Sequence, residues 1–206
     1  MNTPHFSTKQ RILSAAEALF AQHGFAGTSL RQVTTRADVN LAAVNYHFGS
    51  KENLVTEVFR RRLDELTERR LAALDEAMAV PERSLESILR AFVEPALGMT
   101  LDRSGGAAFV RVLARAYAEK NERFRLFLSD NYGHVLRRFA QAITAELPHL
   151  SKQELYWRLD FTAGALTYAM ADFGTIKRPG GVSERAHCER AAEQLVRFAA
   201  AGLRAH

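Results

Sequence analysis

The chain has 206 residues, 47% of them hydrophobic, which is enough for one large core or for a small domain beside a larger one. Its formal net charge of +5 suits a protein that binds a polyanion, although many unrelated soluble proteins reach this value. There is no apolar run of 18 residues, no leader of a secreted protein, and the single cysteine, Cys188, cannot form an internal disulfide. We therefore expect no membrane span, no export, and a cytoplasmic protein.

The first predicted element is an amphipathic helix from Thr8 to Gly24. Residues 1–7 show no periodicity, whereas apolar residues from Ile12 to Phe20 recur at the spacing of one helix face. Gly24 is placed to end the helix. Its N-terminal end carries Lys9 and Arg11, which we expect to be able to contact a phosphate.

Two short helices joined by a tight turn are predicted between Ser29 and Lys51. Ser29 followed by Gln32 has the spacing of a capping box, and a second cap at Asn40 follows the break at residues 38–40. On a helical wheel, the second helix, residues 41–47, has a buried side of Leu41, Val44 and Phe48. The other side carries small, polar and aromatic residues, namely Ala42, Ala43, Tyr46 and His47. This composition fits a helix inserted in the DNA major groove.

A long helix then follows, from about residue 51 to 78, with its start at Ser50 and Asn53. It would span roughly 40 Å and can connect two domains. Lys51 in its first turn is assigned to a DNA phosphate. The basic group at residues 60–62 is expected on a solvated or ion-paired face, because acidic residues lie close by in the sequence.

The rest of the chain has helical periodicity, with helices expected at about 84–100, 106–118, 122–147, 151–173 and 184–203. Pro95 should kink or end the first of these. No strand pattern appears, so the expected fold class is all-α. The expected division is a helix-turn-helix domain at residues 1–55, the connector, and a larger helical domain at residues 79–206.

Two segments carry a family resemblance: TKQRILSAAEALFAQHGFAGTSLRQV, starting at Thr8, and NYHFGSKENLV, starting at Asn45. They resemble the DNA-binding domain of TetR-family transcriptional regulators over about the first 55 residues. That resemblance implies a three-helix helix-turn-helix domain and a larger C-terminal domain for ligand binding and dimerisation. The family usually has an aromatic residue where this chain has Asn45, which can either pack or contact a base. The candidate DNA-binding residues are Thr28, Ser29, Arg31, Asn40, Ala42, Ala43, Asn45, Tyr46, His47 and Lys51.

Arginines within apolar helices of the C-terminal region need an anionic partner, which either the protein or a ligand can supply. The segments FVRVLARAYAE and ELYWRLDFTAGALTYAM resemble the ligand-binding domain of the PsrA-type subgroup, which responds to long-chain fatty acids or acyl-CoA thioesters. This implies a hydrophobic tunnel with a cationic mouth. For each aromatic residue the alternative is simple core packing. The candidate ligand-binding residues are Phe109, Arg111, Tyr117, Trp157, Arg158 and Phe161.

Small and apolar residues in helices 151–173 and 184–203 indicate a close helix contact, which is either a dimer face or interior packing. The family resemblance favours a homodimer through these two helices. A two-fold dimer should bind a palindromic double-stranded DNA operator, from which a small hydrophobic effector would release it. The function predicted is thus a ligand-responsive transcriptional repressor.

The sequence also bears on two other classes of protein, an enzyme and a helical interaction module. No glycine-rich phosphate loop, His-Glu-x-x-His motif, cysteine pair or nucleophile elbow occurs, and the histidines fit no metal-binding spacing. We therefore expect neither an enzyme nor a bound cofactor or metal. The alternative to a regulator is a helical module for protein interaction or lipid binding that lacks DNA binding.

Overall fold

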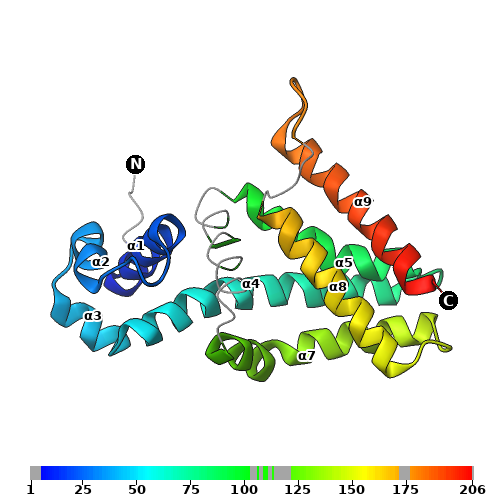
Figure 1. Cartoon of the computed structure of the whole chain (residues 1–206), viewed down its shortest axis with the longest axis horizontal. Coiled ribbons are helices and arrows are strands. Elements are labelled where there is room, and N and C mark those ends of the chain that lie inside the picture. The colour runs from blue at the N-terminus through cyan, green and yellow to red at the C-terminus, as the bar shows by residue number, and fades with distance from the viewer. Residues whose placement is uncertain are drawn as a thin grey trace. The chain divides into compact units, whose positions relative to one another are not determined.

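The computed structural model describes residues 6–102, 122–171 and 177–205, together with Gly106, Phe109, Val110 and Leu113. Within these ranges every regular element is a helix and no strand occurs, which confirms the predicted all-α fold (Figure 1). None of the described helices has both the length and the hydrophobicity needed to cross a bilayer.

The chain forms two compact units, and the boundary between them lies within one long helix, α4 (Lys51–Ala79). The first unit comprises Met1–Asp64 and Arg103–Glu119, and the second comprises Glu65–Asp102 and Lys120–His206. The sequence-based division follows chain order and places residues 103–119 in the larger domain. In the structure they belong to the first unit.

The first unit is built from α1 (Thr8–His23), α2 (Leu30–Ala37), α3 (Leu41–Phe48) and the start of α4. Local capping explains where these helices begin. Ser7 and Gln10 form a capping box at α1, and Ser29 and Gln32 form the predicted one at α2. The Ser50 side chain accepts a hydrogen bond from the Asn53 backbone at the start of α4, at 3.1 Å. These predicted starts are therefore confirmed.

A row of aromatic side chains fills the core of the first unit. The ring of Phe25 lies 5.4 Å from Phe20 and 5.8 Å from Phe59, and Phe59 lies 5.8 Å from Phe109 in an edge-on contact. Phe109 has no exposed surface at all. Phe109 therefore completes this core, which accounts for its place in the first unit.

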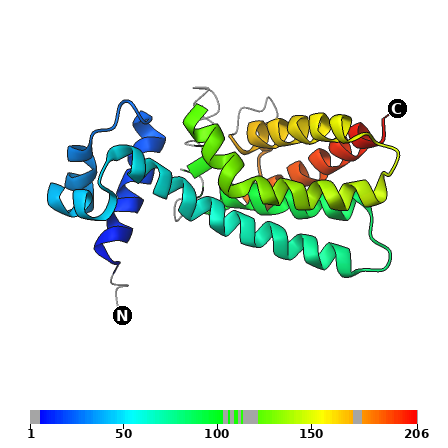
Figure 2. The same cartoon turned by 90° about the horizontal axis from the view of Figure 1, so that it is seen from below.

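The second unit contains the rest of α4, then α5 (Leu85–Gly98), a short 3-10 helix η1 (Met99–Leu101), α7 (Glu122–Glu146), α8 (Lys152–Met170) and α9 (Glu184–Arg204). α5 lies at its centre, in contact with α7, α8 and α9 (Figure 1, Figure 2). One face of α5 is accordingly buried along its length, including Ile88, Val93 and Ala96.

One expectation about this region changes, and a second lies largely outside the described residues. α5 continues through Pro95 to Gly98, so the prediction that Pro95 ends the helix early is wrong. Burial of Val93, Ala96 and Leu97 on either side of the proline stabilises the turn that it interrupts. The predicted helix at 106–118 lies largely outside the described residues, although the described positions within it are helical and Phe109, Val110 and Leu113 among them are buried.

Polar contacts join the helices of the second unit at several points. The Arg70 guanidinium lies 3.9 Å from the centre of the Phe92 ring and donates to the Phe92 carbonyl oxygen at 2.9 Å. The first turn of α5 is joined to the end of α9 through Glu86 and Arg204, whose Nη2 donates to Oε2 at 2.9 Å. This hydrogen bond from Arg204 lowers the pKa of the Glu86 carboxyl below its ordinary value.

Candidate nucleic-acid interface

The turn between α2 and α3 orients α3. Asp38 ends α2 in the left-handed conformation (φ 52°, ψ 56°), and the Val39 N–H donates to the Thr34 carbonyl at 3.1 Å. The Asn40 side chain then accepts a hydrogen bond from the Ala43 backbone at 2.8 Å, which caps α3. The two helices and the tight turn between them form a helix-turn-helix, in which α3 also contacts α1.

Only the C-terminal part of the predicted buried side of α3 is buried. Val44 and Phe48 are 1% and 5% exposed, whereas Leu41 is 50% exposed. The prediction that Leu41 is buried is therefore wrong. A helical wheel places Leu41 close to Phe48 in angle but ignores position along the axis, and the packing of α3 does not reach its first residue.

The outward side of α3 lies open to solvent. Ala42 and Asn45 are exposed, and Tyr46 is 86% exposed, while Ala43 and His47 are half-buried at its margins. The Tyr46 and His47 rings meet edge-on with centroids 5.2 Å apart, which limits the orientations that Tyr46 can adopt. Because Asn45 is exposed, its side chain does not pack in the core. This excludes core packing, one of the two roles that the sequence left open for Asn45.

Three cations lie on the neighbouring helices: Arg31 and Arg36 on α2, which contacts α3, and Lys51 at the start of α4. None of the three has a carboxylate partner among the described residues, and Asp38 is the one acidic residue between positions 28 and 51. Lys9 and Arg11, by contrast, are paired: Lys9 lies 3.3 Å from Glu57, and Arg11 donates to the Asp38 carbonyl at 3.3 Å. The unpaired positive charge therefore lies with α2 and with the start of α4.

Thr28 departs from the predicted set. Its side chain is 1% exposed, and its hydroxyl donates to the Gly24 carbonyl at 2.8 Å. The prediction that Thr28 contacts DNA through its side chain is therefore wrong, because the hydroxyl fastens the loop between α1 and α2. Ser29 and Asn40 are exposed, but each side chain also caps a helix.

The structure describes four of the six candidate ligand-binding residues. Phe109 is core against Phe59, and Trp157 and Phe161 are 57% and 63% exposed with their rings 5.7 Å apart. Trp157 borders an open groove of about 360 Å³ lined also by Leu136, Gln153, Tyr156 and Asp160. Arg111 and Tyr117 lie outside the described residues. The ligand role of Phe109, Trp157 and Phe161 therefore stays a prediction.

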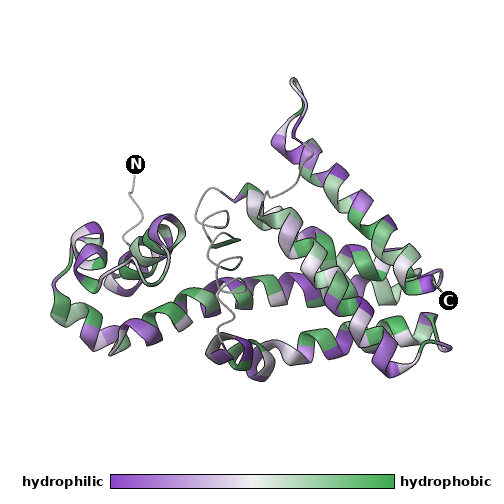
Figure 3. Ribbon diagram, in the orientation of Figure 1, coloured by the Kyte–Doolittle hydropathy of each residue, from purple (hydrophilic) through white to green (hydrophobic). Residues whose placement is uncertain are grey.

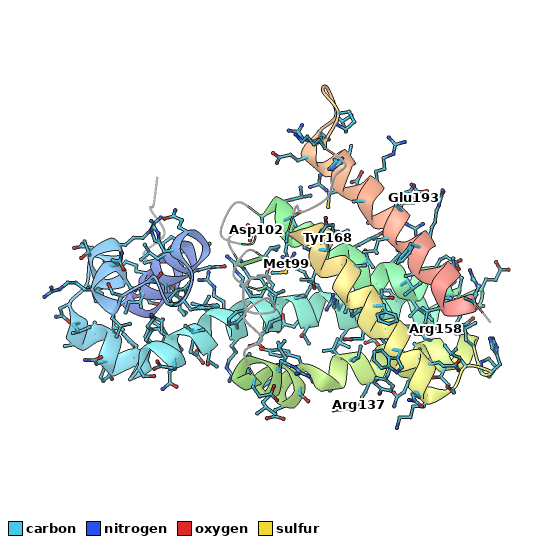
Figure 4. All side chains as sticks on the ribbon, viewed as in Figure 1. Met99, Asp102, Arg137, Arg158, Tyr168 and Glu193 are labelled. Atoms are coloured by element: carbon cyan, nitrogen blue, oxygen red, sulfur yellow. The ribbon has the colours of Figure 1, made fainter. Side chains whose placement is uncertain are left out.

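Arg158 has hydrogen-bond partners within the protein. Its Nη1 donates to the carbonyl oxygens of Gly202, Leu203 and Ala205 at 3.1, 2.9 and 2.7 Å. These carbonyls end α9, where the helix dipole is negative, so a guanidinium there both satisfies unpaired acceptors and neutralises partial charge (Figure 4). The protein thus supplies acceptors to Arg158, one of the two alternatives that the sequence left open, and a ligand role for Arg158 stays a prediction.

α8 leaves a row of aromatic side chains uncovered. Trp157, Phe161 and Tyr168 are more than half exposed and recur at spacings of four and seven residues, so they share one face. Gly164 lies between them, and a Cβ added there would meet no atom within 4 Å. On α9, Phe198 is 66% exposed, whereas Ala192, Leu195, Ala199 and Leu203 pack inside the unit. Apolar positions alternate with polar ones along both helices (Figure 3).

Two family models match the chain. Residues 12–58 match "Bacterial regulatory proteins, tetR family", and residues 90–202 match "Tetracyclin repressor-like, C-terminal domain". The probable HTH-type transcriptional regulator YttP of Bacillus subtilis is 46% identical over 57 residues, which cover 26% of this chain and 28% of YttP. The HTH-type transcriptional repressor AcnR of Corynebacterium glutamicum is 28% identical over 88 residues, 43% of this chain and 42% of AcnR. The chain thus matches less than half the length of each of these relatives.

Solved structures share the fold over nearly the whole chain. A TetR-like transcriptional regulator from Rhodococcus sp. RHA1 superposes with a TM-score of 0.65 at 22% identity and covers 100% of both chains. A TetR-family transcriptional regulator from Bordetella parapertussis gives a TM-score of 0.68 at 16% identity, over 93% of this chain and 95% of its own. At these identities the likeness establishes the fold.

Proposed function

Since the chain belongs to the TetR family of bacterial regulatory proteins, a family of DNA-binding transcriptional regulators, we propose that it is a cytoplasmic, homodimeric repressor of transcription. This proposal rests mainly on the uncharged, exposed side of α3, with Arg31, Arg36 and Lys51, which have no carboxylate partner among the described residues, on the adjoining helices α2 and α4. A major groove admits one helix, with base edges in front of it and phosphates on both sides.

In the proposed complex, α3 enters the major groove and the flanking groups bind phosphates. Tyr46 and His47 contact the DNA from the outer side of α3, and Ala42 and Ala43 allow close approach. Lys51 and Arg31 supply charge to the phosphates, and the start of α2 at Ser29 contributes its backbone N–H groups. Thr28 is not part of this set, because its hydroxyl is buried.

The proposed dimer forms through α8 and α9. Trp157, Phe161 and Tyr168 on α8 and Phe198 on α9 leave apolar surface in water, and burial against a second copy would stabilise the pair. A two-fold dimer presents two copies of α3. The operator should therefore be a near-palindrome whose half-sites recur about one helical turn apart, or a multiple of it.

A small hydrophobic effector is the proposed signal, with long-chain fatty acids and acyl-CoA thioesters as the class to test first. The support is the resemblance of two C-terminal segments to fatty-acid-responsive regulators and the match of residues 90–202 to a tetracyclin repressor-like C-terminal domain. Arg111 and Tyr117 remain candidate ligand contacts. An effector lowers operator affinity only if it binds more tightly to the form that cannot bind DNA. Mass spectrometry of molecules that co-purify with the protein tests this assignment.

Binding to the DNA upstream of its own gene, followed by fluorescence anisotropy at several salt concentrations, tests DNA binding. Affinity should fall steeply with salt, because each neutralised phosphate releases counterions. Lys51→Ala and Arg31→Ala should each weaken binding and reduce the slope of log K against log salt by about 1. The control Arg197→Ala removes the same charge from α9 and should leave the slope unchanged. Equal slopes for all three variants would contradict the proposed phosphate contacts.

A further inference from the structure

The solvent-facing side of α3 has a specific composition. At 100° per residue, Leu41, Asn45, Ala42 and Tyr46 follow one another over an arc of roughly 140°. All four are exposed, and Leu41 and Tyr46 are 50% and 86% exposed. None of them is charged at neutral pH. The groups that α3 presents are therefore one aliphatic side chain, one methyl group, one amide and one phenol.

The Asn45 side chain is free to bind a base. No hydrogen bond engages its amide in the described part of the chain, whereas the Asn40 amide oxygen is occupied by the cap of α3. An exposed carboxamide offers a donor and an acceptor side by side. This pair matches the N7 acceptor and the N6 amino donor of adenine in the major groove.

Leu41 lies one helical turn before Asn45 and about 40° from it in angle, and Ala42 lies on the other side of Asn45. Leu41 is half exposed because the packing of α3 does not reach it. The apolar group that a major groove offers to such side chains is the C5 methyl of thymine. Guanine is most often bound by Arg or Lys, and α3 carries neither, since the cations lie on α2 and at the start of α4.

We propose that α3 reads A·T base pairs, with the Asn45 amide bound to adenine N7 and N6 and with Leu41 and Ala42 in contact with thymine methyl groups. The proposal rests on the DNA-binding function proposed above and specifies which bases the same surface selects. Each operator half-site should accordingly contain adjacent A·T pairs at the positions that α3 covers.

Selection of binding sites from a random duplex library by the full-length protein gives the half-site directly. A·T pairs at the centre of each enriched half-site are expected. Base analogues in that site then test the individual contacts. Replacing thymine with uracil removes only the C5 methyl, and replacing adenine with 7-deazaadenine removes only the N7 acceptor.

Uracil at the one position that Leu41 contacts should weaken wild-type binding about fourfold, the value for one buried methyl group, and should have no effect on Leu41→Ala. Uracil at the position that Ala42 contacts should weaken the wild type and Leu41→Ala alike. 7-Deazaadenine should weaken wild-type binding about tenfold and leave Asn45→Ala unaffected. Uracil placed outside the protected sequence is the matched DNA control. Circular dichroism of both variants should match the wild type, because both side chains are exposed.

Specific binding to half-sites with G·C pairs under α3 would overturn the proposal and leave the DNA-binding function intact. The same holds if the analogues weaken wild-type and variant proteins equally. Failure to enrich any sequence, with no binding to the upstream DNA, would instead overturn the proposed function itself.

Discussion

Arg62 and Glu17 form a two-pronged ion pair inside the first unit. Arg62 Nε lies 2.9 Å from Glu17 Oε1 and its Nη2 lies 3.3 Å from Oε2, and both side chains are 4% exposed. The pair joins α1 to α4 within this unit. Removal of one partner leaves the other charge buried, which costs far more than the intact pair contributes.

Arg62→Ala should therefore lower the free energy of unfolding by about 3–5 kcal/mol. The neighbouring Arg61 is exposed and donates to Ser14 at 3.4 Å, so Arg61→Ala is a matched control with an expected change below about 0.5 kcal/mol. Urea denaturation of the full-length variants measures both values. Equal stability of the two variants would show that the buried pair does not stabilise the unit.

Arg158→Ala should release the last turn of α9. Three carbonyl oxygens would lose a charged donor, and the cost should be about 1.5–3 kcal/mol. Hydrogen exchange should speed up for amides near residues 201–205 and remain unchanged in α1. Arg197→Ala, which breaks only an exposed pair with Glu193, serves as the control. Loss of effector response with unaltered α9 protection would instead return Arg158 to a ligand-binding role.

The Glu86 and Arg204 pair predicts a pH dependence. Because the Arg204 hydrogen bond lowers the Glu86 pKa in the folded protein, the pair stabilises the fold above the ordinary pKa of 4.5. This stabilisation is lost as the pH falls through the lower, folded-state pKa. Glu86→Gln should cost at most about 1 kcal/mol at pH 7, since the pair is largely accessible to solvent. At pH 3 the difference from wild type should be smaller.

Thermal unfolding of wild type and Glu86→Gln between pH 7 and pH 3 measures this change. Arg204→Ala removes the cationic partner of the same pair. It should show the same change of stability with pH as Glu86→Gln. A stability difference that stays constant from pH 7 to pH 3 would contradict the assignment.

The proposed dimer face predicts a change of oligomeric state. Phe161→Asp with Phe198→Asp should give a folded monomer, because a buried, unpaired carboxylate on each helix opposes association. Leu126→Asp is the control, since Leu126 on α7 is also a half-exposed apolar residue. Analytical ultracentrifugation distinguishes the two. A monomeric wild type, or a dimer in the double variant, would contradict the proposed interface.

Features that depend on neighbours in sequence were predictable. The caps at Ser29 and Asn40 and the start of α4 follow from spacings of three or four residues. The uncharged outer side of α3 was predictable for the same reason. Such patterns need no knowledge of the tertiary fold.

Features that depend on partners distant in the sequence were not predictable. Arg62 is one of three consecutive arginines, and its partner Glu17 lies 45 residues earlier. The acceptors of Arg158 lie 44 to 47 residues later in the chain. The exposure of Leu41 depends on how far the packing of α3 extends along its axis. Periodicity alone does not predict this extent.

Operator binding by the exposed side of α3, in two symmetric copies, is open to a direct test. That test is footprinting of the full-length protein on its upstream DNA. We expect two protected blocks related by a palindrome, spaced by one helical turn or a multiple of it, and their loss in the Tyr46→Ala, Lys51→Ala double variant. The absence of a protected palindrome, or unchanged protection by the double variant, would contradict the account.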